Sequence, residues 1–149
     1  MDKKIKVALT IVITFLLSLA LVFKFFYPIP AFKNFYTVVS LVELLMVILL
    51  LAFYTRWFVW AGLACVFSLW GGYCLYTTIF GLPCSCLGAA LMLPRGVSLA
   101  LNGALTTSCW VVLKGYSLNS KVIHKLVVLC PFLFVVGFLS ASILYKIYF

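Results

Sequence analysis

The chain has 149 residues, of which 67% are hydrophobic and 9% are charged, and its mean hydropathy is +1.30. A soluble domain averages about 45–50% apolar and roughly 25% charged residues, so this composition excludes a water-soluble globular domain. The net charge of +9 comes from scattered cations that flank apolar runs, which argues against a nucleic-acid-binding surface.

We expect a single transmembrane domain over residues 1–149, because about 20 apolar residues per span leave room for four or five helices. The first apolar run follows a basic start and covers residues 5–27. This run is longer than the roughly 7–15 apolar residues of a signal peptide. It therefore predicts an uncleaved span, although residues 18–20 weakly match a cleavage site. Pro28 and Pro30 then end the helix.

The rest of the chain continues this pattern of long apolar runs and short polar connections. The connections are a tight turn at Arg56, a loop over 81–96 and a polar loop over 114–125 that holds His124. An apolar piece inside the second of these is too short to cross a bilayer. The expected spans are residues 36–54, 58–80, 97–113 and 126–147. Together the runs predict an all-α bundle of four to five spans.

The distribution of lysine and arginine predicts the orientation of this bundle. With a cytoplasmic N-terminus, seven cations lie on the inner side and four on the outer side. The inner set is Lys3, Lys4, Lys6, Arg56, Lys114, Lys121 and Lys125, and the outer set is Lys24, Lys33, Arg95 and Lys146. This split favours an N-in, C-out topology with the 81–96 loop outside. In a bacterial inner membrane that side is the periplasm, where disulfides persist.

The 81–96 loop contains Cys84 and Cys86, preceded by Pro83 and bracketed by Gly81 and Gly88. Cysteines at this spacing can bring their α-carbons within the roughly 4.4–6.8 Å that a disulfide requires. A strained, exposed disulfide exchanges readily with other thiols, so we interpret the pair as catalytic and redox-active. The alternatives are two incidental loop cysteines, a permanent bridge, and a copper(I) or zinc site, although two thiolates are too few for a closed metal site.

Three polar side chains are expected at similar depth beneath this loop. A helical rise of about 1.5 Å per residue puts Lys24, Glu43 and Asn102 about 5, 10 and 8 Å inside the membrane. An unpaired charge there is costly, so Glu43 should lie within about 5 Å of Lys24 or Asn102. The group is then either a Lys24–Glu43 structural pair capped by Asn102, or a proton relay or the polar wall of a redox site. Cys74, on the same half of the third span, is a candidate third thiol, with simple packing as the alternative.

The remaining thiols and the small residues predict packing. Cys65, Cys109 and Cys130 lie inside apolar runs and are expected to pack as small hydrophobic side chains. Small residues four apart allow helices to approach closely in a membrane. We therefore expect spans three and four to pack antiparallel through such faces, and span five offers another. The faces are Ala64, Ser68 and Gly72; Ala100, Ala104 and Ser108; and Gly137 and Ala141.

These motifs resemble the MauE/DoxX-like redox-associated membrane proteins over roughly residues 7–113. The matching pieces are Phe23-Lys24-Phe25, Ser40-Leu41-Val42-Glu43-Leu44-Leu45 and Pro83-Cys84-Ser85-Cys86-Leu87-Gly88, followed by Asn102. Leu87 replaces the family's usual phenylalanine, and the fifth span lies outside the four-span core. MauE-type members are implicated in maturing methylamine dehydrogenase with a thioredoxin-like partner. The resemblance implies a thiol–disulfide role and such a periplasmic partner, but not methylamine as the substrate.

Three functions therefore stay open. The favoured one is a lipid-embedded component of thiol–disulfide exchange, an oxidoreductase component acting through Cys84 and Cys86. The second is a non-enzymatic scaffold or assembly subunit whose cysteines are structural. The third is a small transporter or metal-handling protein that uses Lys24, Glu43 and Asn102 as a polar path. No cofactor motif is evident, and a quinone acceptor would have no recognisable binding motif in this sequence.

Overall fold

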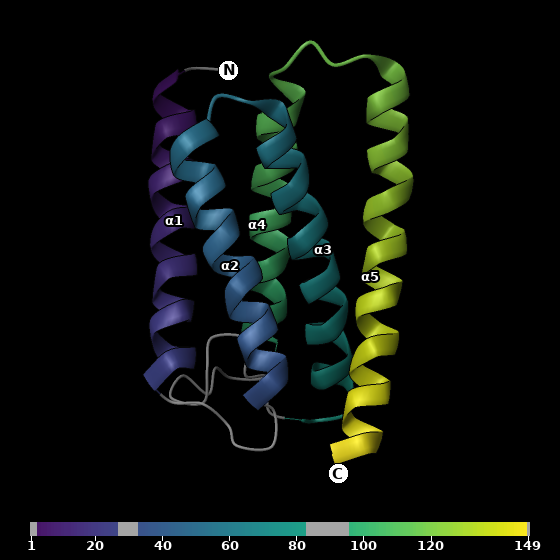
Figure 1. Cartoon of the computed structure of the whole chain (residues 1–149). Coiled ribbons are helices and arrows are strands. Elements are labelled where there is room, and N and C mark those ends of the chain that lie inside the picture. The colour runs from purple at the N-terminus through teal and green to yellow at the C-terminus, as the bar shows by residue number, and fades with distance from the viewer. Residues whose placement is uncertain (1–2, 27–32, 83–95, 149) are drawn as a thin grey trace.

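The computed structural model describes residues 3–26, 33–82 and 96–148, and within these ranges the chain forms five α-helices. They are α1 (Lys3–Phe26), α2 (Lys33–Phe53), α3 (Trp57–Ile79), α4 (Val97–Lys114) and α5 (Ser120–Tyr148). Consecutive helices run in opposite directions, which gives the bundle two ends (Figure 1). We call these the Arg56 end, where α2 turns into α3, and the Gly81 end, where α3 finishes and α4 begins. The predicted all-α fold is confirmed.

Four of these helices are long and apolar enough to cross a membrane. The candidate spans are Lys4–Phe26, Trp57–Ile79, Val97–Lys114 and Ser120–Lys146, and α2 contributes a shorter apolar stretch, Thr37–Phe53. Large apolar side chains cover the outside of the bundle; Phe15, Leu41 and Phe132 are each more than 60% exposed. Such a surface is stable against lipid chains and not against water. The chain is thus a multi-pass integral membrane protein, as its composition predicts.

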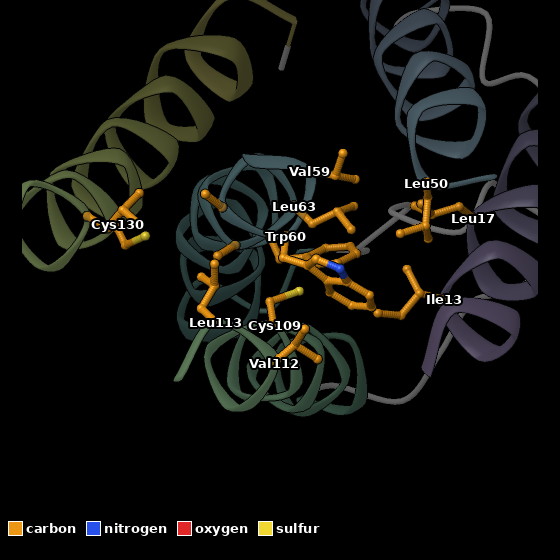
Figure 2. Packing of buried hydrophobic residues seen from close by; sticks show 14 of the residues in the cluster. Ile13, Leu17, Leu50, Val59, Trp60, Leu63, Cys109, Val112, Leu113 and Cys130 are labelled. Carbon is orange, nitrogen blue, oxygen red and sulfur yellow. The ribbon is translucent and has the colours of Figure 1, made fainter. Parts of the chain in front are cut away.

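The main apolar core lies around α3. Trp60 of α3 is fully buried between Ile13 of α1 and the side chains of Cys109 and Val112 on α4, while Cys130 of α5 lies on the other side of α3 (Figure 2). The Trp60 indole nitrogen donates a hydrogen bond of 2.7 Å to the Tyr54 carbonyl, which satisfies its one polar atom. The central position of α3 explains why it has no single apolar face.

Helices α3 and α5 meet through two glycines. A Cβ on Gly72 would lie 2.8 Å from the carbonyl carbon of Phe134, and one on Gly137 would lie 2.9 Å from that of Leu69. Ala141, which is also buried, extends this contact along α5. Gly72, which was predicted to belong to a face toward α4, therefore packs against α5. Helices α3 and α4 do pack together, as expected.

The small-residue face predicted for α4 is wrong. Ala100 and Ala104 are exposed, and α4 instead buries Ser98, Asn102 and Cys109 toward α3. Apart from Lys114 at its end, Asn102 is the most polar side chain of α4, and it is buried. Burying its amide among protein groups is less costly than exposing it to lipid, so Asn102 decides which face of α4 turns inward.

The fifth helix begins earlier than the sequence predicts. The other four helices start and end within three residues of their expected spans, but α5 starts at Ser120 and not at 126. Asn119 causes the difference, since its side-chain oxygen accepts a hydrogen bond of 3.0 Å from the Lys121 amide and caps the first turn. His124 therefore lies exposed on α5 and not in a loop.

Candidate functional site

The predicted catalytic pair, Cys84 and Cys86, lies outside the residues that the structure describes. The two flanking glycines are described, and both have a positive φ: 67° at Gly81 and 88° at Gly96. At the end of α3, Gly81 donates to the Thr78 carbonyl and Leu82 donates to the Thr77 carbonyl, the bond pattern that ends many helices at glycine. Glycine at these points fixes where the cysteine segment leaves α3 and where α4 begins.

Lys24 and Glu43 form the expected ion pair between α1 and α2. The Lys24 ammonium donates to Oε1 of Glu43, and the two side chains are only 2% and 1% exposed. The ammonium also lies 5.4 Å from the ring centre of Trp70 on α3, within reach of a cation–π attraction. Two opposite charges removed from solvent must hold each other in place, because either one alone would be a bare charge in a low-dielectric interior.

Asn102 connects α4 to the buried thiol of Cys74 on α3. Its amide nitrogen donates to the Ser98 carbonyl at 2.9 Å and lies 3.5 Å from the Cys74 sulfur. Cys74 is fully buried, and its carbonyl accepts hydrogen bonds from Thr77 and Thr78. The contact gives the Cys74 sulfur a polar neighbour from α4 in addition to its apolar packing.

A small cavity joins these two groups. Its volume is about 30 Å³, and Glu43 and Asn102 both contribute to its wall. The other lining residues are Leu16, Leu17, Ala20, Phe67, Trp70, Ser98, Leu101 and Leu105. Lys24, Glu43, Asn102 and Cys74 thus form one connected group on four helices, which we call the polar cluster. Lys24, Glu43 and Asn102 were expected at similar depth, whereas the contact with Cys74 and the cavity were not predicted.

Ser98 and Trp70 are two of the cavity residues that were not predicted from the sequence. Ser98 is 4% exposed and lies four residues before Asn102, so the two share one face of α4. That spacing of two polar residues in an apolar helix was a signal that sequence could have supplied. No comparable signal marked Trp70, because an aromatic residue in a span is ordinary.

The other described thiols lie away from the polar cluster. Cys109 and Cys130 are buried in the core around α3, and Cys65 on α3 shares a side-chain hydrogen bond with Cys130. All three are free thiols, which agrees with their predicted role as small packed side chains. Within the described ranges, no three histidine, cysteine, aspartate or glutamate side chains gather closely enough to hold a metal ion.

Fold and site together define an α-helical, multi-pass integral membrane protein with a buried ion pair and a buried amide–thiol contact near its Gly81 end. Comparison with protein-family models, with curated proteins and with solved structures finds no match to this chain.

Proposed function

We propose that this protein is the membrane component of a thiol–disulfide exchange system that supports redox maturation of periplasmic proteins. The reactive groups are Cys84 and Cys86, as the resemblance to MauE/DoxX-like proteins implies. The polar cluster is the observation that carries the proposal. It holds charged, amide and thiol groups in an otherwise apolar bundle, on the half from which the cysteine segment extends (Figure 1).

The polar cluster supports a redox role because such groups are costly in a membrane and are kept there for a function. Lys24 and Glu43 supply opposite charges, and Asn102 presents its amide to the Cys74 sulfur. A thiol exchange site is favoured by nearby polar and charged groups, and the polar cluster supports placing such a site at this half of the bundle. In this proposal, Cys74 is a third thiol, buried on α3 beside Asn102.

The proposed orientation has the N-terminus in the cytoplasm of a bacterial cell and the Gly81 end at the periplasmic surface. This orientation rests on the excess of lysine and arginine toward the Arg56 end, because segments rich in these cations stay on the cytoplasmic side of the membrane. Arg56 and Lys114 lie at that end together with the start of α1, whereas Lys24 and Lys146 lie toward the other (Figure 1).

The proposed chemistry is two successive thiol–disulfide exchanges. The Cys84 thiolate attacks a disulfide in a thioredoxin-like partner; a sulfur–sulfur bond forms between the proteins, and one partner thiolate leaves and takes up a proton. The Cys86 thiolate then attacks Cys84, which frees the second partner thiolate. Two electrons pass from the cysteine pair to the partner disulfide. The same steps run in reverse when the partner arrives as a dithiol.

Trapping the intermolecular disulfide tests this proposal. Cells that produce the Cys86→Ser variant are quenched with acid, alkylated and examined on a non-reducing gel. A covalent complex with a thioredoxin-fold protein is expected, which reductant dissolves and which the Cys84→Ser, Cys86→Ser double variant lacks. Cys65→Ala serves as the matched control, because it removes a thiol outside the polar cluster and should leave exchange unchanged.

Other outcomes would favour the alternative functions. If single serine variants at both Cys84 and Cys86 trap nothing and retain full function, the redox role is wrong. A pair that stays bridged under reducing and oxidising conditions would indicate a scaffold with a structural disulfide. Unreactive thiols that become reactive after chelation would indicate a metal-handling protein.

A further inference from the structure

The carboxylate of Glu43 is only half satisfied by the protein. Its Oε1 accepts from Lys24, but its Oε2 is buried and has no hydrogen-bond partner among the described residues. The Glu43 side chain is 1% exposed, so bulk water does not reach this oxygen. Leaving a charged acceptor unpaired in such a place is strongly destabilising, and native structures avoid it. Something must therefore donate a hydrogen bond to Oε2.

The cavity beside Glu43 has the size and the walls to hold the missing donor. A water molecule needs about 10–15 Å³ of such space, so about 30 Å³ admits one or two water molecules. Three of its lining residues are polar: Glu43, Asn102 and Ser98. Purely apolar cavities stay dry, whereas a water with two or more polar partners is held firmly.

We propose that this cavity is a water-binding site, in which one or two water molecules donate to Oε2 of Glu43 and are held by Asn102 and Ser98. The water completes the hydrogen bonding of the buried carboxylate while Lys24 balances its charge. It also gives Glu43 a partner for proton exchange inside the bundle, next to the residue that contacts Cys74. This inference stands on the cavity and the unpaired oxygen, and does not require the thiol–disulfide role.

Hydroxyl-radical footprinting in ¹⁸O-labelled water detects such a site in the intact protein. X-ray pulses make radicals from bound water, so side chains that touch it are oxidised even when bulk solvent cannot reach them. Phe67 lines the cavity and is 1% exposed, which makes it the reporter; Trp57 is 38% exposed and reports the radical dose. We expect ¹⁸O on Phe67 of the unmodified protein. A dry cavity would leave Phe67 unlabelled while Trp57 reacts, and this would overturn the proposal.

Filling the cavity gives a second, independent test. Ala20 lines it and is 3% exposed, so Ala20→Val replaces water with methyl groups. We expect Phe67 to lose its label and the melting temperature to fall by roughly 2–10 °C, because Oε2 is left unpaired. The control places the same substitution in a Lys24→Met, Glu43→Leu background. With no carboxylate to hydrate, Ala20→Val should there leave the melting temperature unchanged or raise it. If Ala20→Val lowers the melting temperature equally in both backgrounds, steric crowding alone is the cause. If it raises the melting temperature of the original protein, the cavity is dry. Either result refutes the water site.

Discussion

Substituting Gly72 by alanine tests how α3 and α5 are held together. The new Cβ would lie 2.8 Å from the Phe134 carbonyl carbon and 2.9 Å from the Phe138 amide nitrogen, whereas ordinary contacts begin at 3.4 Å. These atoms belong to the α5 backbone and cannot rotate away as a side chain can. The Phe134 carbonyl oxygen lies closer still to the new Cβ. The two helices must therefore separate, and contacts along the whole interface weaken.

The size of the effect follows from two opposing contributions. Overpacking of this kind costs about 1–3 kcal/mol, and alanine in place of glycine returns about 1 kcal/mol of helix stability. Because the obstacle is backbone, we expect a net loss of about 1–2 kcal/mol. Gly103→Ala is the matched control, since a Cβ on Gly103 meets no atom within 4 Å. Gly103→Ala should therefore show only the higher helix propensity of alanine, which raises the free energy of unfolding by up to about 1 kcal/mol.

Reversible unfolding in mixed micelles measures both variants, with SDS mole fraction as the denaturant and tryptophan fluorescence as the signal. Gly72→Ala should unfold at a lower SDS fraction than the unmodified protein, and Gly103→Ala at the same fraction or a higher one. Gly137→Ala repeats the test from α5, where the new Cβ meets the Leu69 backbone. If Gly72→Ala proves as stable as Gly103→Ala, the close contact between α3 and α5 is wrong.

Three further outcomes are expected. Glu43→Ala should lower the free energy of unfolding by about 3–5 kcal/mol, because it leaves the buried Lys24 ammonium without a counter-charge. The Lys24→Ala, Glu43→Ala double variant should lose less, and a larger loss in the double variant would contradict the pairing. Asn119→Ala removes the cap of α5 and should cost about 1 kcal/mol in the same assay, where unchanged stability would rule the cap out. A membrane-impermeant maleimide should label reduced Cys84 or Cys86 in whole cells, and labelling only after permeabilisation would reverse the proposed topology.

The positions of the helices could be read almost entirely from the sequence. Long apolar runs have to become helices in a bilayer, because each backbone polar group must then be satisfied within its own segment. Such a signal is local, so four of the five helices lie where hydropathy predicts them. The start of α5 was missed because hydropathy does not register a cap, and Asn119 extends the helix through a lysine-rich stretch that reads as a loop.

The polar cluster was predictable only in part. A buried Glu43 needs a cation, and Lys24 is the one at a matching depth, so composition and helical rise nearly specify that pair. Which faces of α3 and α4 meet is a different kind of question. Apolar residues surround α3 on all sides, and small residues on α4 offered a plausible contact that the structure leaves exposed.

The sequence by itself therefore determined a multi-pass helical membrane protein, the approximate extent of its spans and the need of its one intramembrane carboxylate for a partner, Lys24 or Asn102. Tertiary structure alone decided that Gly72 packs against α5, that Asn102 turns toward Cys74 and that a cavity remains beside Glu43. The physical reason is that hydropathy and charge are properties of single residues, so they can be read from the sequence. Packing in a bilayer instead depends on the fit of whole helix surfaces, because lipid gives apolar faces no preference for one neighbour over another.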